Sequence, residues 1–322
     1  MHHRVVTESY AIASAVACVI ALALAVPVFA ASSAKGQRVW LVALAVTQLP
    51  MAALTFFAVR VPIVRPLWSR LLEAFDPDAA RALAAHDPDV LARSPLLAAL
   101  LAIEAPLTEE LAKLGPLLLA LLWPPLRRRF FADDARRVPV ALAIGLGFGL
   151  GEIWLLAVIG SGAPEVQGLP WYALSGFIVE RVMVCGLHGL MTAVAVVQLG
   201  RGAARVTAGL LGAMALHVAL NLPIVLSHAR ALGVASETWT MIATLWAQVF
   251  LFVMILVARW MHVRRDGKPR SFLGDVRCPT CKQVYARPLM GVNLPWARYE
   301  ECGRCGTWQW VRASDEVADD LK

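Results

Sequence analysis

The stretch PLLAALLAIEAPLTEELAKLGPLLLALLW, residues 95–123, carries the two features that decide the fold of this chain. Its apolar residues continue for longer than the roughly 20 residues that a helix needs to cross about 30 Å of membrane hydrocarbon. Within it stand four charged residues, Glu104, Glu109, Glu110 and Lys113. A charged side chain at the centre of a membrane helix costs about 3 kcal/mol on insertion scales. The stretch therefore predicts a membrane helix in which the charged residues serve a function that offsets their cost.

Six further apolar runs accompany this one. Of the 322 residues 59% are hydrophobic and only 16% are charged, and the mean hydropathy is +0.63. Because a soluble domain carries about a quarter charged residues, this composition excludes ordinary soluble, disordered and collagen-like proteins. The first run is about 20 residues long and is followed by equally apolar runs, so we interpret it as a retained helix and not as a signal peptide. The predicted spans lie near residues 10–31, 39–58, 95–123, 138–160, 171–199, 203–227 and 239–262.

These spans predict an all-α polytopic membrane helix bundle of about seven transmembrane helices over residues 1–263. Helices are expected because an open-ended segment in lipid must satisfy its own backbone hydrogen bonds. A soluble domain follows over residues 264–322. Between the second and third spans, residues 60–94 form a polar connection, in which residues 66–75 and 79–85 can make short interfacial helices.

Basic residues in short loops predict the orientation of the spans. Arg and Lys gather at residues 127–137, 201–205 and 259–270, whereas the loops at 161–170 and 228–238 carry almost none. The basic loops should face the cytoplasm, which places the N-terminus outside and the C-terminus inside. Arg60, Arg65 and Arg70 run against this prediction, because they would then lie outside.

Ionisable residues on four different spans share one depth. Counted from the ends that should face the cytoplasm, they lie roughly 18 to 21 Å into their helices, at 1.5 Å rise per residue. They are Glu110, Glu152, His188 and His217. Polar residues that are satisfied separately have no reason to share a depth, whereas one buried site requires it. We therefore predict that these four side chains converge in one site and that Glu104 lies outside it.

Spacing within the spans supports a single site. Lys113 follows Glu110 by three residues and Glu109 by four, so its ammonium can neutralise one carboxylate and leave the other available. Lys113 is then either a counter-ion or a direct participant. Asn221 follows His217 by four residues and shares its helix face, either as a contact between helices or as a functional residue.

The run Gly145-Leu-Gly-Phe-Gly-Leu-Gly151 stands directly before Glu152. Small residues let helices approach closely in lipid, so we interpret the run as a packing surface that brings Glu152 against its neighbours. Phe148, inside the run, is interpreted as a packing residue. Arg181, next to Glu180, is interpreted as structural.

Taken in order, these residues form a pattern. The motifs are Glu109-Glu110-Leu-Ala-Lys113, Gly145-Leu-Gly147-Phe148-Gly149-Leu-Gly151-Glu152, Arg181 with His188, and His217-Val-Ala-Leu-Asn221. Over residues 95–227 the chain resembles the PrsW family of intramembrane proteases, which is related to the CAAX-processing and bacteriocin-processing membrane proteases. It departs from the family at Ile153, where the family often has Asn, and at Asn221, where close relatives have Asp.

The resemblance implies an intramembrane peptidase with Glu109 as the base and Glu110 held by Lys113, although the residues alone do not separate the two glutamates. A carboxylate in a low-dielectric cavity can activate water for peptide hydrolysis. His188 and His217 with Glu152 also match the two-imidazole, one-carboxylate coordination of a catalytic zinc. The alternative is a metal-free glutamate mechanism with His217 and Asn221 as donors to the oxyanion. The predicted catalytic residues are Glu109, Glu110, Lys113, Glu152, His188, His217 and Asn221.

Four cysteines near the C-terminus form two CxxC pairs, Cys278 with Cys281 and Cys302 with Cys305. Two such pairs at this separation predict a structural zinc held by four thiolates in a zinc ribbon. The ribbon needs the metal because roughly 50 residues bury too little to fold alone. Tyr285, Trp296, Tyr299, Trp308 and Trp310 are predicted to form its small core. Its role is open, and its partner can be a cytoplasmic protein, a nucleic acid or the inner leaflet.

The leading hypothesis is an endopeptidase of a bacterial plasma membrane that cuts a membrane protein or a membrane-associated peptide. A proton- or cation-coupled transporter is the alternative, because buried Glu, His and Arg at one level also describe a proton relay. Transporters usually show an internal repeat, and the sequence shows none that is convincing. A third possibility is a catalytically silent scaffold whose ribbon recruits a partner.

Overall fold

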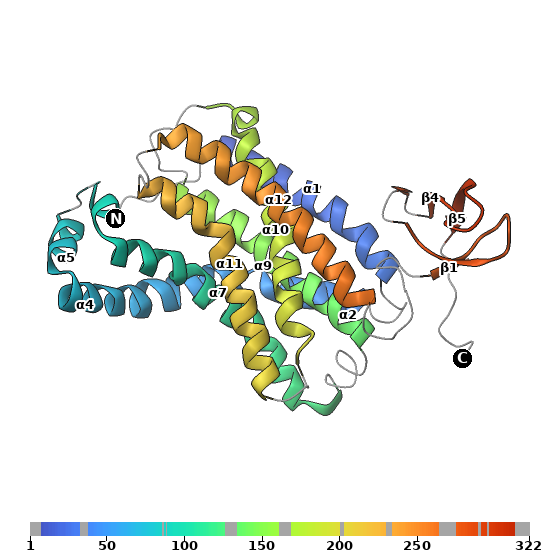
Figure 1. The fold of residues 1–322 in the computed structure, drawn as a ribbon, viewed down its shortest axis with the longest axis horizontal. Helices are drawn as coiled ribbons and strands as arrows, with labels where there is room; N and C mark the ends of the chain where they lie inside the picture. The colour runs from blue at the N-terminus through green and yellow to red at the C-terminus, as the bar shows by residue number, and fades with distance from the viewer. Residues whose placement is uncertain are drawn as a thin grey trace.

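The computed structural model describes residues 8–32, 38–85, 87, 89–125, 134–160, 169–199, 203–229, 234–263, 275–288, 291–294 and 296–312. Over these ranges the chain is helical as far as Val263 and forms short β-strands from Asp275 onward (Figure 1). Helices and strands therefore follow in the predicted order. The predicted domain boundary at residues 263 and 264 stays a prediction, because residues 264–274 lie outside the described part of the chain.

Each of the seven predicted spans corresponds to one helix or to several consecutive helices. The helices are α1 Glu8–Ser32, α2 Arg38–Gln48, α3 Met51–Leu54, η1 Thr55–Val64, α4 Arg65–Phe75, α5 Pro77–Ala84, α6 Val90–Arg93, α7 Pro95–Leu122, α9 Asp134–Gly160, η3 Trp171–Leu174, α10 Ser175–Val196, α11 Ala203–His228 and α12 Ser236–Val263. Two are irregular, because η1 is a π-helix and η3 is a 3₁₀ helix.

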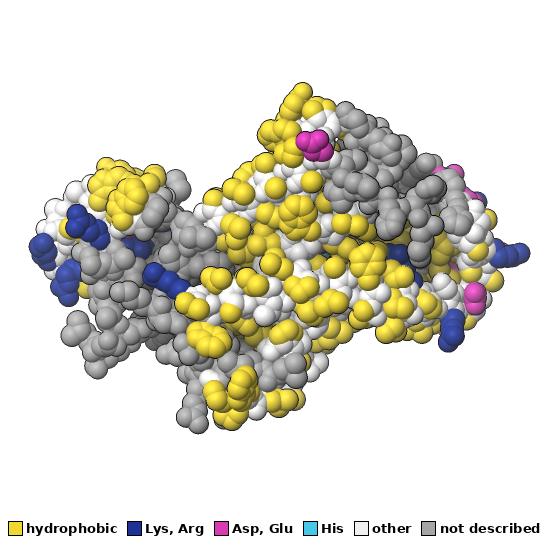
Figure 2. Space-filling model, turned by 180° about the vertical axis from the view of Figure 1, so that it is seen from behind, with side chains coloured by type: hydrophobic (Ala, Val, Ile, Leu, Met, Phe, Trp, Pro, Cys, Tyr) yellow, Lys and Arg dark blue, Asp and Glu magenta, His cyan; other side chains and the backbone are white. Residues whose placement is uncertain are grey.

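Several helices are suited to a membrane. Among the described residues, five stretches are long and apolar enough to cross one: Glu8–Ala25, Arg38–Phe75, Arg137–Gly160, Trp171–Val196 and Ala203–Ser227. A shorter apolar stretch in α12 covers Met241–Val257, and α7 differs from the others by its four charged residues. Figure 2 shows hydrophobic side chains over the middle of the visible face, with Lys and Arg toward its two ends. The chain is thus an integral membrane protein, while the count of seven spans stays a prediction.

The predicted orientation is likewise untested. It depends on loop residues such as 127–129, 201 and 264–270, which lie outside the described residues. The two short helices expected in the polar connection are confirmed as α4 and α5. Asp76 begins α5 by accepting the Ala79 N–H, as an N-cap residue does.

Helix α9 lies at the centre of the bundle and packs against α1, α2 and α10. Its glycines make this packing possible on two sides. A Cβ at Gly145 would stand 2.2 Å from the backbone nitrogen of Gly189 in α10, and a Cβ at Gly147 would stand 2.0 Å from the carbonyl oxygen of Ala45 in α2. Gly149 and Gly151 repeat the two approaches one turn later. The predicted packing surface is confirmed.

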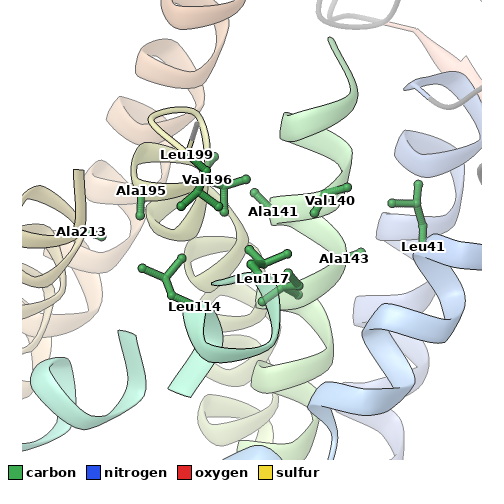
Figure 3. Close-up of a cluster of buried hydrophobic side chains, with 12 residues drawn as sticks. Leu41, Leu114, Leu117, Val140, Ala141, Ala143, Ala195, Val196, Leu199 and Ala213 are labelled. Carbon is green, nitrogen blue, oxygen red and sulfur yellow. The ribbon is translucent and has the colours of Figure 1, made fainter. Parts of the chain in front are cut away.

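A buried apolar cluster joins α2, α7, α9, α10 and α11 (Figure 3). It includes Leu114 and Leu117 of α7, Ile144 of α9, Val196 of α10 and Ala213 of α11. Within each helix these residues lie toward the same end of the bundle, at the C-terminal halves of α7 and α10 and the N-terminal halves of α9 and α11. The cluster therefore closes one end of the space between these helices.

The C-terminal part consists of two small antiparallel sheets. A hairpin pairs β1, Asp275–Arg277, with β2, Val284–Ala286. A second sheet has the order β3-β4-β5, with β3 at Val292–Asn293, β4 at Ala297–Glu301 and β5 at Trp308–Arg312. The core contains Val276, Tyr285, Val311, Cys278 and Cys302.

The predicted aromatic core of this domain is wrong except for Tyr285. Trp296, Trp308 and Trp310 are 69%, 48% and 49% exposed, and Tyr299 is half-buried. Strands β4 and β5 instead turn Arg298, Glu300 and Val311 inward. This is possible because Glu300 finds partners inside, accepting a hydrogen bond from the Tyr285 hydroxyl at 2.8 Å and pairing with Arg298 at 2.8 Å.

Candidate functional site

Six of the seven predicted catalytic residues meet between four helices. Helix α7 contributes Glu109, Glu110 and Lys113, α9 contributes Glu152, α10 contributes His188 and α11 contributes His217. Their side chains are linked by the short contacts described below. The predicted convergence of residues from these helices at one depth is therefore confirmed, while their roles remain to be tested.

Glu110 is fixed by two partners at the bottom of the site. Its Oε1 lies 2.6 Å from the Lys113 Nζ and 2.9 Å from the His217 Nδ1. The side chains of Glu110 and Lys113 have no exposed surface at all. Because an ionised carboxylate only accepts, we assign the Nδ1 of His217 as the donor to Glu110, which leaves the Nε2 of His217 with a lone pair.

His188 is held from both sides of its ring. Its Nδ1 lies 2.8 Å from the Lys113 Nζ, and its Nε2 lies 3.0 Å from the Oε2 of Glu152. An ammonium has only donors, so we assign Nδ1 as the acceptor and Nε2–H as the donor to Glu152. Lys113 therefore connects Glu110 to His188 and is more than the counter-ion of one carboxylate.

Phe148 and Arg181 support this arrangement. The Phe148 ring meets the His188 ring edge to face at 5.5 Å between centroids, and the Lys113 Nζ lies 5.0 Å from the centre of the Phe148 ring. Arg181 pairs with its neighbour Glu180, as expected, and also lies 3.4 Å from the Oε2 of Glu152. It thus neutralises the carboxylate that contacts His188.

Arg60 is a member of the site that the sequence did not reveal. It lies in η1 and not in a polar loop, and its guanidinium donates to the Oε1 of Glu109 at 2.8 Å and to the Thr108 hydroxyl at 3.0 Å. Arg65 pairs in the same way with Glu104 at 3.1 Å. The one available signal was a single arginine inside the apolar run TFFAVRVPIV, residues 55–64. Arg60 and Arg65 thus both bind glutamates of α7, and the predicted orientation, against which they were set, stays untested.

Glu109 has one buried oxygen beside His217. Its Oε2 is buried and has no hydrogen-bond partner among the described residues. The Nε2 of His217, which carries the lone pair assigned above, lies 3.8 Å from this oxygen. A second oxygen without such a partner, the Oε2 of Glu110, belongs to the carboxylate that Lys113 already neutralises.

Three of these residues have the geometry of a metal site. Ligand atoms of Glu109, His188 and His217 all lie within 4.8 Å of one another, and all three residues are buried. The sequence-based set of ligands contained Glu152 in place of Glu109, and that assignment stays a prediction. A buried carboxylate oxygen without a partner beside an imidazole lone pair fits a divalent metal ion, since imidazole and carboxylate are common zinc ligands.

Asn221 lies one turn beyond His217 and is half-buried. Within the described part of the chain its side chain makes no hydrogen bond or ion pair. The expected role of Asn221 as an oxyanion donor therefore stays a prediction.

Exposure of the charged side chains rises in one direction through the site. The exposed fraction is zero for Lys113, 17% for Glu152 and 43% for Glu180. The opposite end is closed by the apolar cluster around Leu114 and Leu117 (Figure 3). Among the described residues, the charged side chains of the site are therefore most exposed on the side of Glu180.

The four C-terminal cysteines form a second compact cluster. All four sulfurs lie within 4.8 Å of one another, with 3.8 Å between Cys278 and Cys305 and 3.9 Å between Cys281 and Cys302. Zinc–sulfur bonds of about 2.3 Å in a tetrahedron place sulfurs roughly 3.8 Å apart, so the cluster has the size of a zinc site.

The backbone around the cysteines is that of two matching turns. Lys282 and Gly306, each directly after the second cysteine of a pair, have φ of 63° and 72°. Burial works against ionisation of Cys278, but the Cys281 N–H and the Gln309 side chain donate to its sulfur and lower the pKa of the Cys278 thiol to about 6. Cys278 is therefore prepared to bind a metal as a thiolate.

Comparison with known proteins gives one match. A model of the PrsW family of intramembrane metalloproteases matches residues 80–262, more than half of the chain. No curated protein matches the chain, and neither does any solved structure. The matched range includes all seven predicted catalytic residues and leaves out Arg60 and the four C-terminal cysteines.

Proposed function

The chain belongs to the PrsW family of intramembrane metalloproteases, and on this basis we propose that it is an endopeptidase that hydrolyses a peptide bond of a membrane protein or membrane-associated peptide. Its working residues are those between α7, α9, α10 and α11. The observation that carries the proposal is the buried Oε2 of Glu109, which has no hydrogen-bond partner in the described part of the chain and lies 3.8 Å from the Nε2 of His217.

Glu109 is the carboxylate that acts on the reacting water. A general base must be within hydrogen-bond reach of the proton that it takes, and the Oε2 of Glu109 is open to a small molecule in the site. Arg60 holds the other oxygen of Glu109 at 2.8 Å and so fixes where Oε2 points. Glu110, by contrast, orients His217 and balances the charge of Lys113.

The remaining residues supply the polar surroundings that hydrolysis requires. Asn221, on the helix face of His217, is the donor that we assign to the oxyanion, because the Nδ1–H of His217 is already bonded to Glu110. Donors fixed in a dry site stabilise the oxyanion that forms on the scissile carbonyl. Glu152 and Lys113 hold the His188 ring in one tautomer, so that proton transfers in the site begin from a defined state.

A divalent metal ion fits the same site. Glu109, His188 and His217 would hold it, and His188 would have to give up its contact with Lys113 so that its Nδ1 offers a lone pair. When bound, the metal would act as a Lewis acid on the scissile carbonyl and the water. In that state Glu109 is a ligand, and the carboxylate left for proton transfer is Glu152, at 3.0 Å from the His188 Nε2. Replacing Glu109 removes activity in either state, and metal analysis tells the two states apart.

The substrate enters from the open end of the site. The exposed fraction of the charged side chains rises toward Glu180, and the apolar cluster blocks the other end. With the N-terminus outside and the C-terminus in the cytoplasm, as the basic loops predict, this opening faces the outer side of a bacterial plasma membrane. A substrate with its cleavage site near the outer half of the membrane is therefore favoured.

The test is proteolysis by the purified full-length protein in nanodiscs, with fluorescein-labelled casein and labelled single-span peptides as probes. Wild-type protein should release fragments, and Glu109→Gln should release them at least about 100-fold more slowly while it stays folded, as its melting transition shows. Cleavage at wild-type rate by a folded Glu109→Gln variant would overturn the proposal and favour the transporter, for which buried ionisable residues form a proton path.

A further inference from the structure

The three-stranded sheet of the C-terminal domain carries its aromatic side chains on the outside. Val292 of β3 stands opposite Tyr299 of β4, which stands opposite Trp310 of β5. Alternate residues of a strand share a face, so these three side chains form a row across the sheet, and Trp308 shares the face of Trp310. We call Val292, Tyr299, Trp308 and Trp310 the aromatic face.

The aromatic face is one continuous patch. The ring centroid of Tyr299 lies 5.0 Å from that of Trp310 and 5.5 Å from that of Trp308. Val292, also on this face, is 58% exposed. Figure 2 shows hydrophobic side chains gathered at the end of the molecule that carries the strands. An exposed apolar patch on a small domain marks an interaction surface.

The other face of the sheet is satisfied within the domain itself. Glu300 is fully buried between Tyr285 and Arg298. Burial raises the pKa of Tyr285, and the hydrogen bond to Glu300 raises it further, so this phenol keeps the proton that it donates. The core is therefore complete without the aromatic face, which stays available for a partner.

The segment that connects the C-terminal domain to the helix bundle limits how far the aromatic face can move from α12. Eleven residues, RRDGKPRSFLG, join the end of α12 at Val263 to the start of β1 at Asp275. A fully extended chain covers about 3.5 Å per residue, which keeps the domain within about 40 Å of the end of α12. Four of the eleven residues are basic and one is acidic. The tether is thus short and positively charged.

The surface of a bilayer matches both the aromatic face and its tether. Trp and Tyr favour the headgroup level because their rings are amphipathic, and basic residues beside the membrane are attracted by anionic lipids. We propose that the aromatic face rests in the headgroup layer of the anionic membrane that holds α12. A single-stranded nucleic acid would need several basic side chains between stacking rings. This face presents aliphatic Val292 and exposed Glu301, and Arg312 is the one basic residue among the strand positions that share it.

Photo-crosslinking in the full-length protein tests the proposal without any measurement of proteolysis. The protein is prepared with benzoylphenylalanine in place of Trp310, placed in nanodiscs of phosphatidylcholine and phosphatidylglycerol, and irradiated. Mass spectrometry should find phospholipid attached at this position. A metal content equal to that of wild type shows that the domain of the variant is folded. If the Trp310 variant does not fold, the same probe is placed at Trp308.

Arg277 provides the matched control. It is exposed on β1, in the other sheet of the same domain, so the probe placed there should lose the lipid adducts. Equal lipid labelling at Trp310 and Arg277 would overturn the proposal, because mere proximity would then explain it. Labelling at Trp310 of a second copy of the chain or of another protein, or of nothing at all, would also overturn it.

Discussion

At the scale of single residues, the two adjacent glutamates of α7 each pair one oxygen with a cationic side chain and keep a buried Oε2 without a hydrogen-bond partner among the described residues, but their partners differ. Glu110 shares one oxygen between Lys113 and His217, both within 2.9 Å. Glu109 receives Arg60 on one oxygen and keeps the other without a hydrogen-bond partner among the described residues. One glutamate therefore organises its neighbours, and the other is available to react, so the same substitution should have different effects at the two positions.

Replacing each glutamate by glutamine separates these roles. Glu109→Gln should lower casein cleavage by about 100-fold or more, the usual range for a lost general base. Its melting temperature should fall less than that of Glu110→Gln, because Arg60 is partly exposed and keeps its bond to the Thr108 hydroxyl. Glu110→Gln should lower the melting temperature, because removing one partner of a buried ion pair costs about 3–5 kcal/mol. Combining Glu110→Gln with Lys113→Met should restore stability, since no charge is left alone. Equal loss of stability in both single variants would contradict the assignment.

Arg60 and Arg65 offer a matched pair of substitutions. Both arginines bind a glutamate of α7, but only Arg60 binds a glutamate of the site. Arg60→Met should lower proteolysis about 10- to 100-fold, as for other groups that orient a reacting residue, and Arg60→Lys should recover part of it. Arg65→Met should leave proteolysis near wild type, because the Arg65 side chain is 51% exposed and its pair is weak. Equal activity of Arg60→Met and Arg65→Met would exclude a role for Arg60 in the site.

The sequence predicted those site residues that are related by helical spacing or by a shared depth. It did not predict Arg60, which comes from a different part of the chain. Helical spacing and depth relate Glu110 to Lys113 and place His188 and His217 at one level. Arg60 meets Glu109 across 49 residues of sequence, and no local spacing rule predicts which side of a distant helix such an arginine will face. The free oxygen of Glu109 is likewise a property of three-dimensional contacts.

At the scale of elements, the glycines of α9 decide how closely three helices approach. Gly145 and Gly149 face α10, while Gly147 and Gly151 face α2. This close packing places Glu152, the residue after the last glycine, within 3.0 Å of His188. The long apolar runs made the helices predictable from sequence, since each is long enough to cross a bilayer. The length of an apolar run does not predict which backbone hydrogen bonds its residues make, so the π-helical form of η1 was not foreseen.

Adding one methyl group tests this packing. Gly145→Ala would place a Cβ 2.2 Å from the backbone of Gly189, and backbone cannot move aside as a side chain can. We expect a lower melting temperature in detergent, corresponding to about 1–3 kcal/mol for an overpacked core, together with lower proteolysis. Gly186→Ala in α10 is the control, because its Cβ would meet only a Leu251 side-chain carbon at 3.8 Å. A wild-type melting temperature for Gly145→Ala would show that α9 and α10 pack less closely than the structure indicates.

For the strands of the C-terminal domain, the sequence predicted that the two faces differ but not which face is buried. The residues of β4 and β5 alternate clearly, ARYEE and WQWVR, so their two faces could be assigned. Hydrophobicity suggested that the aromatic face was the inner one. Glu300 decides which face is the inner one, because Tyr285 and Arg298 make its burial possible. The alternation of residues along a strand does not predict these contacts.

At the scale of the whole molecule, the described residues include two metal-sized clusters of different chemistry. One contains a carboxylate and two imidazoles inside the bundle, and the other contains four sulfurs in the C-terminal domain. A chelator would remove metal from both, and loss of the structural metal can unfold a small domain. Loss of proteolysis after chelation therefore does not show by itself that the reaction needs a metal.

Metal analysis of full-length variants separates the two clusters. We expect wild-type protein in detergent to hold about two zinc ions per chain, one for each site with tetrahedral donors. Replacing Cys278, Cys281, Cys302 and Cys305 by Ser should remove one ion, and His217→Ala should remove the other and abolish proteolysis. The cysteine variant should still cleave single-span peptides and should lose this activity when treated with chelator, because only the bundle site then remains. If wild-type protein holds one ion that disappears with the cysteines, Glu109 acts as the base of a reaction without metal, and its Oε2 should remain essential.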